Sequence, residues 1–139
     1  MPSPRLLVVL SSDPDGPVVR HRWRAFEAAL AAAGLVLEVV AWPKDQEGRR
    51  HALHRVETSD GTVVSSRLLA TGDAEAVRRR TRRLAFDLDD ALPYRDSMRG
   101  AGSTWNRRRR FRRLVSRADL VIAGNAYLAT LVERAGGAA

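Results

Sequence analysis

The sequence predicts a single α/β domain of the Rossmann-like class, a parallel sheet of about five strands with helices on both faces. Three observations predict this fold. Aliphatic runs alternate with helix-length segments along the chain, the length of 139 residues suits one domain, and hydrophobic residues make up 45% of the composition.

The predicted strands are short apolar segments bounded by turn residues. The first is the aliphatic run 6–10, which stops at a loop rich in Ser, Asp, Pro and Gly and is typical of a strand buried on both faces. Further strands are predicted at 35–42, 62–69, 84–88 and 120–123. Because helix-length segments separate these runs, we expect parallel pairing with right-handed crossovers.

The predicted helices show apolar residues at spacings of three and four. In 19–33 this stripe consists of Trp23, Phe26, Leu30 and Ala33, and Gly34 ends the helix. Further helices are predicted at 47–56, 73–82 and 105–117. Asn125 is predicted to cap a last helix that runs to Gly136.

The composition excludes some classes of site. The chain has no cysteine, which excludes disulfides, thiol catalysis and thiolate metal sites. The amino-terminal apolar run is too short for a signal peptide or a membrane span. We therefore expect a cytoplasmic protein, with peripheral contact to an anionic membrane as an additional partner.

The net charge of +8 comes almost wholly from arginine, because Lys44 is the only lysine. Six arginines cluster in the predicted helix 105–117 and form a basic surface: Arg107, Arg108, Arg109, Arg110, Arg112 and Arg113. Such a density attracts nucleic acid or anionic lipid, although plain surface helices also carry arginines. No zinc-finger spacing or aromatic-rich RNA-binding signature accompanies them, which argues against nucleic acid. One hypothesis is therefore that the chain is a non-enzymatic module, whose basic surface docks on an acidic partner or a membrane.

Ligands of an open parallel sheet bind beyond the carboxyl ends of its strands. Polar residues, glycines and one tyrosine follow three of the predicted strands, and Arg20 and His21 stand at the start of the first helix. The resulting candidates for a binding cleft are Ser12, Asp13, Gly16, Arg20, His21, Asp87, Asp89, Asp90, Gly124, Asn125 and Tyr127. The loop after the first strand lacks the glycine-rich phosphate-binding patterns, which argues against dinucleotide or triphosphate binding.

The cluster of Asp87, Asp89 and Asp90 needs a partner, because three carboxylates within four positions repel one another. A cation, an arginine or a hydrogen-bond donor would offset the charge. Magnesium is one candidate for this cation, since hard ions bind carboxylate oxygens. The alternative is structural, with Asp87 accepting backbone amides of the following turn while the other two face water.

Three segments together resemble the amino-terminal domain of glycosyltransferase family 4 enzymes of the GT-B fold. They are Arg20-His21-Arg22 leading into a helix that ends at Gly34, the run 86–92 (Phe-Asp-Leu-Asp-Asp-Ala-Leu), and the run 118–129 from Ala118 to Ala129. The resemblance implies an acceptor-side half of a nucleotide-sugar-dependent enzyme, inactive alone, whose cleft candidates would face a sugar or lipid-linked acceptor. It also implies that a separate donor-binding domain, in cis or in trans, would bind the nucleotide-sugar, so that this fragment or split subunit would hold no cofactor or metal.

The run 86–92 also resembles the first motif of haloacid-dehalogenase-type phosphatases. There the first aspartate, here Asp87, is the nucleophile and the second, here Asp89, is the general acid, with magnesium neutralising the site. Ala91 stands where that family has threonine, no lysine follows the motif, and no later acidic pair completes the site. The phosphatase is therefore the second alternative.

Overall fold

The computed structural model describes residues 3–90, 92 and 101–137, and for 101–104 the backbone alone. It contains one parallel sheet in the order β2-β1-β3-β4-β5. The strands are β1 (Arg5–Ser11), β2 (Leu35–Ala41), β3 (Gly61–Ser65), β4 (Leu84–Leu88) and β5 (Leu120–Ala123). The helices are α1 (Pro17–Arg22), the 3₁₀ turn η1 (Arg24–Phe26), α2 (Glu27–Ala32), α3 (Gln46–Thr58), α4 (Thr71–Arg80), α5 (Ala101–Arg117) and α6 (Ala126–Arg134).

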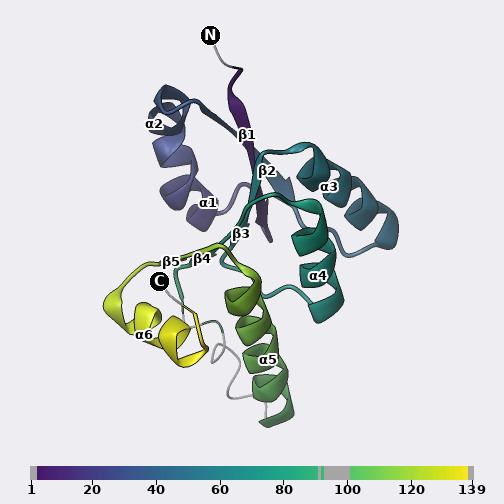
Figure 1. Cartoon of the computed structure of the whole chain (residues 1–139), viewed down its shortest axis with the longest axis vertical. Coiled ribbons are helices and arrows are strands. Elements are labelled where there is room, and N and C mark those ends of the chain that lie inside the picture. Colours follow the sequence, from purple (N-terminus) through teal and green to yellow (C-terminus); the bar gives the residue numbers. More distant parts are fainter. Residues whose placement is uncertain (1–2, 91, 93–100, 138–139) are drawn as a thin grey trace.

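Helices cover both faces of the sheet, which confirms the predicted α/β class. Figure 1 shows α1 and α2 on one side of the strands and α3, α4 and α5 on the other. The core accordingly has two parts. The smaller part lies beneath α1 and includes Val9, Trp23 and Val63, while the larger part includes Phe86 and Leu114 and reaches α6. Strands buried on both faces explain the continuous aliphatic runs in the sequence.

The predicted helix 19–33 is wrong as a continuous element, because the chain breaks at Trp23. Trp23 leaves helical geometry (φ −123°, ψ −58°), and its indole Nε1 donates to Ser65 Oγ at 3.0 Å and to Asp87 Oδ2 at 3.2 Å. After the break, α2 buries none of its residues, and Phe26 is 56% exposed. Phe26 and Ala33 of the predicted apolar stripe therefore do not face the core, whereas Leu30 is partly buried and packs against it.

The third strand is shorter than predicted and ends at Ser65 instead of residue 69. The next residue, Ser66, has a positive φ of 50°, and its backbone N–H donates to the carbonyl oxygen of Asp87 at 2.8 Å. This turn directs the chain away from the sheet and toward α4. The strands predicted at 84–88 and 120–123 agree with β4 and β5, whereas α5 begins at Ala101, earlier than the predicted Trp105.

No helix in the described part of the chain is both long enough and apolar enough to span a bilayer.

Candidate functional site

The strand order places a topological switch between β1 and β3. The connection from β1 leads to β2 on one side of β1, whereas β3, β4 and β5 follow on the other side. In open α/β sheets of this order, ligands bind beyond the carboxyl ends of the strands at such a switch. The loop that follows Ser11 of β1 and the turn Ser66-Arg67 that follows β3 therefore flank the position where a ligand is expected.

Arg67 bridges these two loops. Its Nη1 donates to Ser12 Oγ at 2.7 Å, across 55 positions in sequence. The side chain is half-buried, yet its Nε has no hydrogen-bond partner in the described part of the molecule. The hydroxyl oxygen of the adjacent Ser66 is also buried without a partner. Buried polar atoms are rarely left unpaired, so two neighbouring orphans at a switch point indicate a place for ligand or solvent atoms.

Positive charge accumulates around Arg67. Burial lowers the pKa of its guanidinium below the ordinary value, and the nearby charges of Arg49 and Arg110 lower it further, while Asp73 acts in the opposite direction. The three arginines come from α3, from the turn after β3 and from α5. Like charges are unfavourable neighbours unless a negative charge compensates them, and Asp73, whose charge acts on Arg67 more strongly than that of either arginine, compensates part of this excess. We refer to Ser12, Arg49, Ser66, Arg67 and Arg110 as the switch-point cluster.

A second polar centre lies at the carboxyl end of β4 and contains Asp87, which is 1% exposed. Its carboxylate accepts from Arg22, with Nε 2.9 Å from Oδ2, and also from Trp23 Nε1 and Ser65 Oγ, the latter at 3.2 Å. The hydrogen bond to Asp87 raises the pKa of Arg22, burial opposes this effect, and the charges of Asp87 and Asp89 add to it.

Arg22 is the partner that the acidic cluster needs. The predicted structural alternative, in which Asp87 accepts backbone amides, is wrong, because side chains of Arg22, Trp23 and Ser65 occupy its oxygens. The same bonds argue against the phosphatase alternative, since the proposed nucleophile is neither free nor directed at a metal site. No group of three His, Asp or Glu residues in the described ranges could hold a metal ion.

An apolar pocket of about 360 Å³ opens beside this ion pair. Its lining comes from the α1–α2 segment and β5: Arg22, Trp23, Phe26, Ala29, Leu30, Asp87 and Ile122. Beside the pocket, α2 buries none of its residues, and Ile122 is partly exposed. Its walls suit an apolar group, and the Arg22–Asp87 pair supplies one charged corner.

Three predicted cleft residues order the loop after β1. Asp13 accepts the Asp15 N–H through Oδ1 at 3.1 Å, and Ser12 accepts from Arg67 as described. Gly16 lies against Asp13, where a Cβ would come within 2.9 Å of its Oδ2. Arg20 and His21 occupy the last turn of α1, not its start, and both are exposed. Of this group, Ser12 alone contacts the switch-point cluster.

The remaining predicted cleft residues lie near β4 and β5. Asp89 acts on Arg22 through its charge, and Asp90 is exposed. A Cβ on Gly124 would lie 3.5 Å from Nη1 of Arg22, an ordinary contact distance, so Gly124 lies beside the guanidinium. Asn125 caps α6 as predicted, its Oδ1 accepting from the Leu128 N–H at 2.9 Å, and Tyr127 is exposed. Of these residues, Asp89 and Gly124 lie beside the Arg22–Asp87 pair.

The predicted basic surface does not face in one direction. Arg107 donates through Nε to the Leu92 carbonyl at 2.8 Å, and Arg113 pairs with Glu75 of α4 at 3.0 Å. Arg110 belongs to the switch-point cluster and is exposed, as are Arg108, Arg109 and Arg112.

Sequence reasoning missed Ser66 and Arg67 as site residues, and it considered Arg22 only beside Arg20 and His21, as an arginine that could meet an anionic group. The strand predicted through residue 69 concealed the turn that presents Ser66 and Arg67. The available signal was the polar triplet Ser65-Ser66-Arg67 directly after an apolar run, at the same edge as Ser12.

Comparisons with known proteins bear on the fold. No protein-family model matches the sequence, and no curated protein matches it. Among solved structures, the chain is similar to an NAD(P)H:quinone oxidoreductase from Methanothermobacter marburgensis, with 13% identity and a TM-score of 0.49 over 96% of each chain. This result corrects the prediction of a family 4 glycosyltransferase half with the GT-B fold, because the similar structure is an oxidoreductase. At this identity the likeness concerns the fold alone and assigns no activity to this chain.

Proposed function

We propose that this chain binds a small ligand with one phosphate group at the carboxyl edge of the sheet, between β1 and β3. The observation that carries the proposal is Arg67, whose half-buried guanidinium has an Nε–H without an acceptor among the described residues. A phosphate oxygen would accept this hydrogen and compensate the charge. Hydrogen bonds between guanidinium and phosphate are among the stronger ones in proteins.

The charge balance of the switch-point cluster supports a phosphate over a neutral ligand. Arg49, Arg67 and Arg110 interact electrostatically, and Asp73 is the carboxylate that opposes them. A phosphate monoester carries roughly −1.5 to −2 charges near neutral pH, which offsets this excess. The hydroxyls of Ser12 and Ser66 are of the type that donates to the remaining phosphate oxygens.

The loop after β1 supports one phosphate over several. Its single glycine, Gly16, packs against Asp13, so the loop does not present the series of free backbone N–H groups that cradles a pyrophosphate. Asp13 and Asp15 also place negative charge there, which would repel a second phosphate. A mononucleotide or a sugar phosphate fits these constraints better than a dinucleotide.

The proposal is tested by isothermal titration calorimetry. The whole chain is titrated separately with inorganic phosphate, adenosine monophosphate, flavin mononucleotide and ribose 5-phosphate. We expect saturable binding of at least one of these probes. Arg67→Gln should weaken that binding about tenfold or more, because hydrogen bonds to charged groups contribute about 1.5–3 kcal/mol.

Arg82→Gln is the matched control. It removes the same charge from an exposed residue just before β4, at the amino ends of the strands and away from the switch-point cluster. This variant should leave the affinity unchanged. Equal losses in the two variants would mean that net charge, not the switch-point cluster, attracts the anion. Absence of saturation with all four probes would also refute the proposal.

A further inference from the structure

The solvent face of α5 carries charge and one aromatic ring. The helix buries Phe111, Leu114 and Val115 in the core. On its exposed side stand four residues that we call the α5 face: Trp105, Arg108, Arg109 and Arg112. Their spacings of three, four and seven align them along one side of a helix. No Asp or Glu occurs anywhere in α5.

Trp105 is the exposed member of three tryptophans. It is 61% exposed, whereas Trp23 and Trp42 are buried. The guanidinium carbon of Arg109 lies 5.7 Å from the centroid of the indole ring, a cation–π contact. An exposed tryptophan held by an arginine is unusual on a surface that contacts water alone, since the indole buries much apolar area when it finds a partner.

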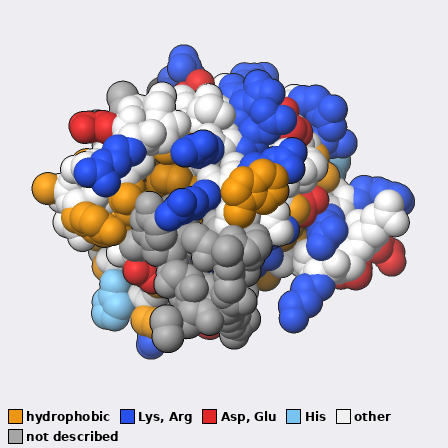
Figure 2. All heavy atoms as spheres, turned by 90° about the horizontal axis from the view of Figure 1, so that it is seen from below, with side chains coloured by type: hydrophobic (Ala, Val, Ile, Leu, Met, Phe, Trp, Pro, Cys, Tyr) orange, Lys and Arg blue, Asp and Glu red, His pale blue; other side chains and the backbone are white. Residues whose placement is uncertain are grey.

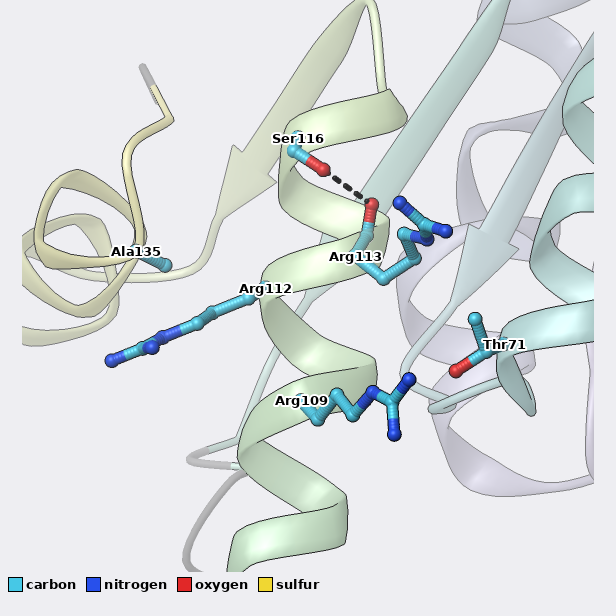
Figure 3. Close-up of a pocket in the computed structure, with 6 residues that line it drawn as sticks. All are labelled: Thr71, Arg109, Arg112, Arg113, Ser116 and Ala135. Carbon is cyan, nitrogen blue, oxygen red and sulfur yellow. Dashed lines mark hydrogen bonds between the residues drawn. The ribbon is translucent and has the colours of Figure 1, made fainter.

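The arginines of α5 divide between two directions. Arg113 and Arg117 both pair with Glu75 of α4, at 3.0 and 2.9 Å, and so serve helix packing. Figure 3 shows Arg109 and Arg113 directed toward Thr71 of α4 and Arg112 extended toward the opposite side of the helix. For Arg109 and Arg112, no carboxylate partner exists within the described ranges.

Two shallow hollows flank these side chains. One, of about 360 Å³, is lined by the four residues of the α5 face. The other, of about 340 Å³, lies among α4, α5 and the end of α6 and is lined by Thr71, Arg109, Arg112, Arg113, Ser116 and Ala135 (Figure 3). In Figure 2, which views the molecule from the end where α5 begins, side chains of the Lys and Arg class lie beside a small hydrophobic group. The surface thus offers several sites for anionic groups around an apolar centre.

We propose that the α5 face docks on a bilayer of anionic phospholipid. Tryptophan prefers the interface between water and acyl chains, and arginines beside it reach the lipid phosphates and carboxylates. A basic helix with one interfacial aromatic residue is typical of such contact. This inference is independent of the switch-point cluster, because the α5 face shares no residue with it.

The geometry favours a bilayer over single-stranded nucleic acid. Proteins that bind single strands stack successive bases on several aromatic rings along a groove. The α5 face has one ring, and Arg109 lies over it, which occupies a stacking surface that a base would need. The ring edge stays available for insertion between headgroups.

The test uses the whole chain and two sets of vesicles, one of phosphatidylcholine and one of equal parts phosphatidylcholine and phosphatidylserine. Flotation should show binding to the phosphatidylserine vesicles alone. Tryptophan emission should shift to the blue and resist acrylamide quenching. Because Trp23 and Trp42 are buried, this signal reports on Trp105, and Trp105→Phe should abolish it.

Charge is tested by two triple variants with equal loss of net charge. Replacement of Arg108, Arg109 and Arg112 by Gln should weaken vesicle binding by about fivefold for each residue. Replacement of Arg79, Arg80 and Arg82 by Gln, which are exposed residues away from α5, should change it little. Arg67→Gln should also bind vesicles normally, which separates this inference from the phosphate site.

Three results would overturn the proposal. They are equal binding to both vesicle sets, equal losses in the two triple variants, and tighter binding to a mixed-sequence single-stranded oligonucleotide than to vesicles. The last result would assign the α5 face to nucleic acid. Circular dichroism confirms that each variant is folded before it is compared.

Discussion

Arg22 and Asp87 lie 65 positions apart in sequence, and their ion pair fixes the break between α1 and η1 to the carboxyl end of β4. Asp87 is almost fully buried, and the Arg22 side chain is 27% exposed. The pair is therefore partly screened, and the carboxylate of Asp87 accepts hydrogen bonds from the side chains of Arg22, Trp23 and Ser65.

Removal of the charge on Asp87 should destabilise the fold. Asp87→Asn leaves Arg22 next to a neutral amide and adds two donors to a site filled with donors, so we expect a loss of about 2–3 kcal/mol. Urea denaturation monitored by circular dichroism measures the change. Asp15→Asn removes the same charge from an exposed loop and should cost less than about 0.5 kcal/mol. Equal midpoints for the two variants would contradict the buried role of Asp87.

The positive φ of Ser66 should have a measurable cost. A residue with a side chain pays about 1–2 kcal/mol in this region, whereas glycine adopts it freely. Ser66→Gly should therefore raise the free energy of unfolding by about 0.5–1 kcal/mol, after allowance for the greater freedom of glycine in the unfolded chain. The same variant should bind phosphate more weakly if Ser66 Oγ contacts the ligand. A lower stability than that of the unmodified chain would show that Ser66 is not strained.

Asp119 should make stability depend on pH. Its Oδ2 accepts from the Leu84 N–H and from Arg78 Nη1, both at 2.9 Å, and these bonds lower the pKa of the carboxyl below its usual range. A lowered folded-state pKa stabilises the fold above the unfolded pKa of about 4 and loses this effect as pH falls through the folded pKa. Asp119 is largely exposed, so screening limits the effect to about 1 kcal/mol. The stability gap between the unmodified chain and Asp119→Asn should be full at pH 7 and should close in the acid range below pH ~4.

The amide of Asn125 should contribute to the start of α6. Asn125→Ala removes the acceptor of the Leu128 N–H and should cost about 1 kcal/mol. Asn125→Asp keeps an acceptor and adds a favourable charge at a helix amino end, so it should be neutral or stabilising. Thermal unfolding of the two variants distinguishes them, and equal losses would mean that the residue matters for reasons other than capping.

The sequence predicts β4 and β5 to the residue, because strands buried on both faces leave uninterrupted apolar runs. It could not predict the break at Trp23. The helical spacing continues through Phe26 and Leu30, and the cause lies at Ser65 and Asp87, which are 42 and 64 positions away. The order of the strands also depends on contacts between distant parts of the chain, so the sequence could not predict it. The same holds for the switch point, where Arg67 contacts Ser12.

The resemblance to glycosyltransferases illustrates how fold requirements can imitate a family. In the segment 118–129, the apolar residues form β5, Gly124 lies beside Arg22, and Asn125 caps α6. In 86–90, the apolar residues are core and Asp87 is an ion-pair partner. Strand formation, core packing, a helix cap and an ion pair explain these features. The two sequence segments therefore carry less information about function than their length implies.

The central place of β1 also has a consequence for the order of folding. Both of its neighbours, β2 and β3, follow it in the next stretch of chain, so the amino-terminal 65 residues can assemble a three-stranded unit with α1 and α3. β4 and β5 then add one at a time to the same edge, after α4 and α5 respectively. During synthesis, where domains form progressively from the amino terminus, this arrangement lets the sheet grow outward from an early nucleus.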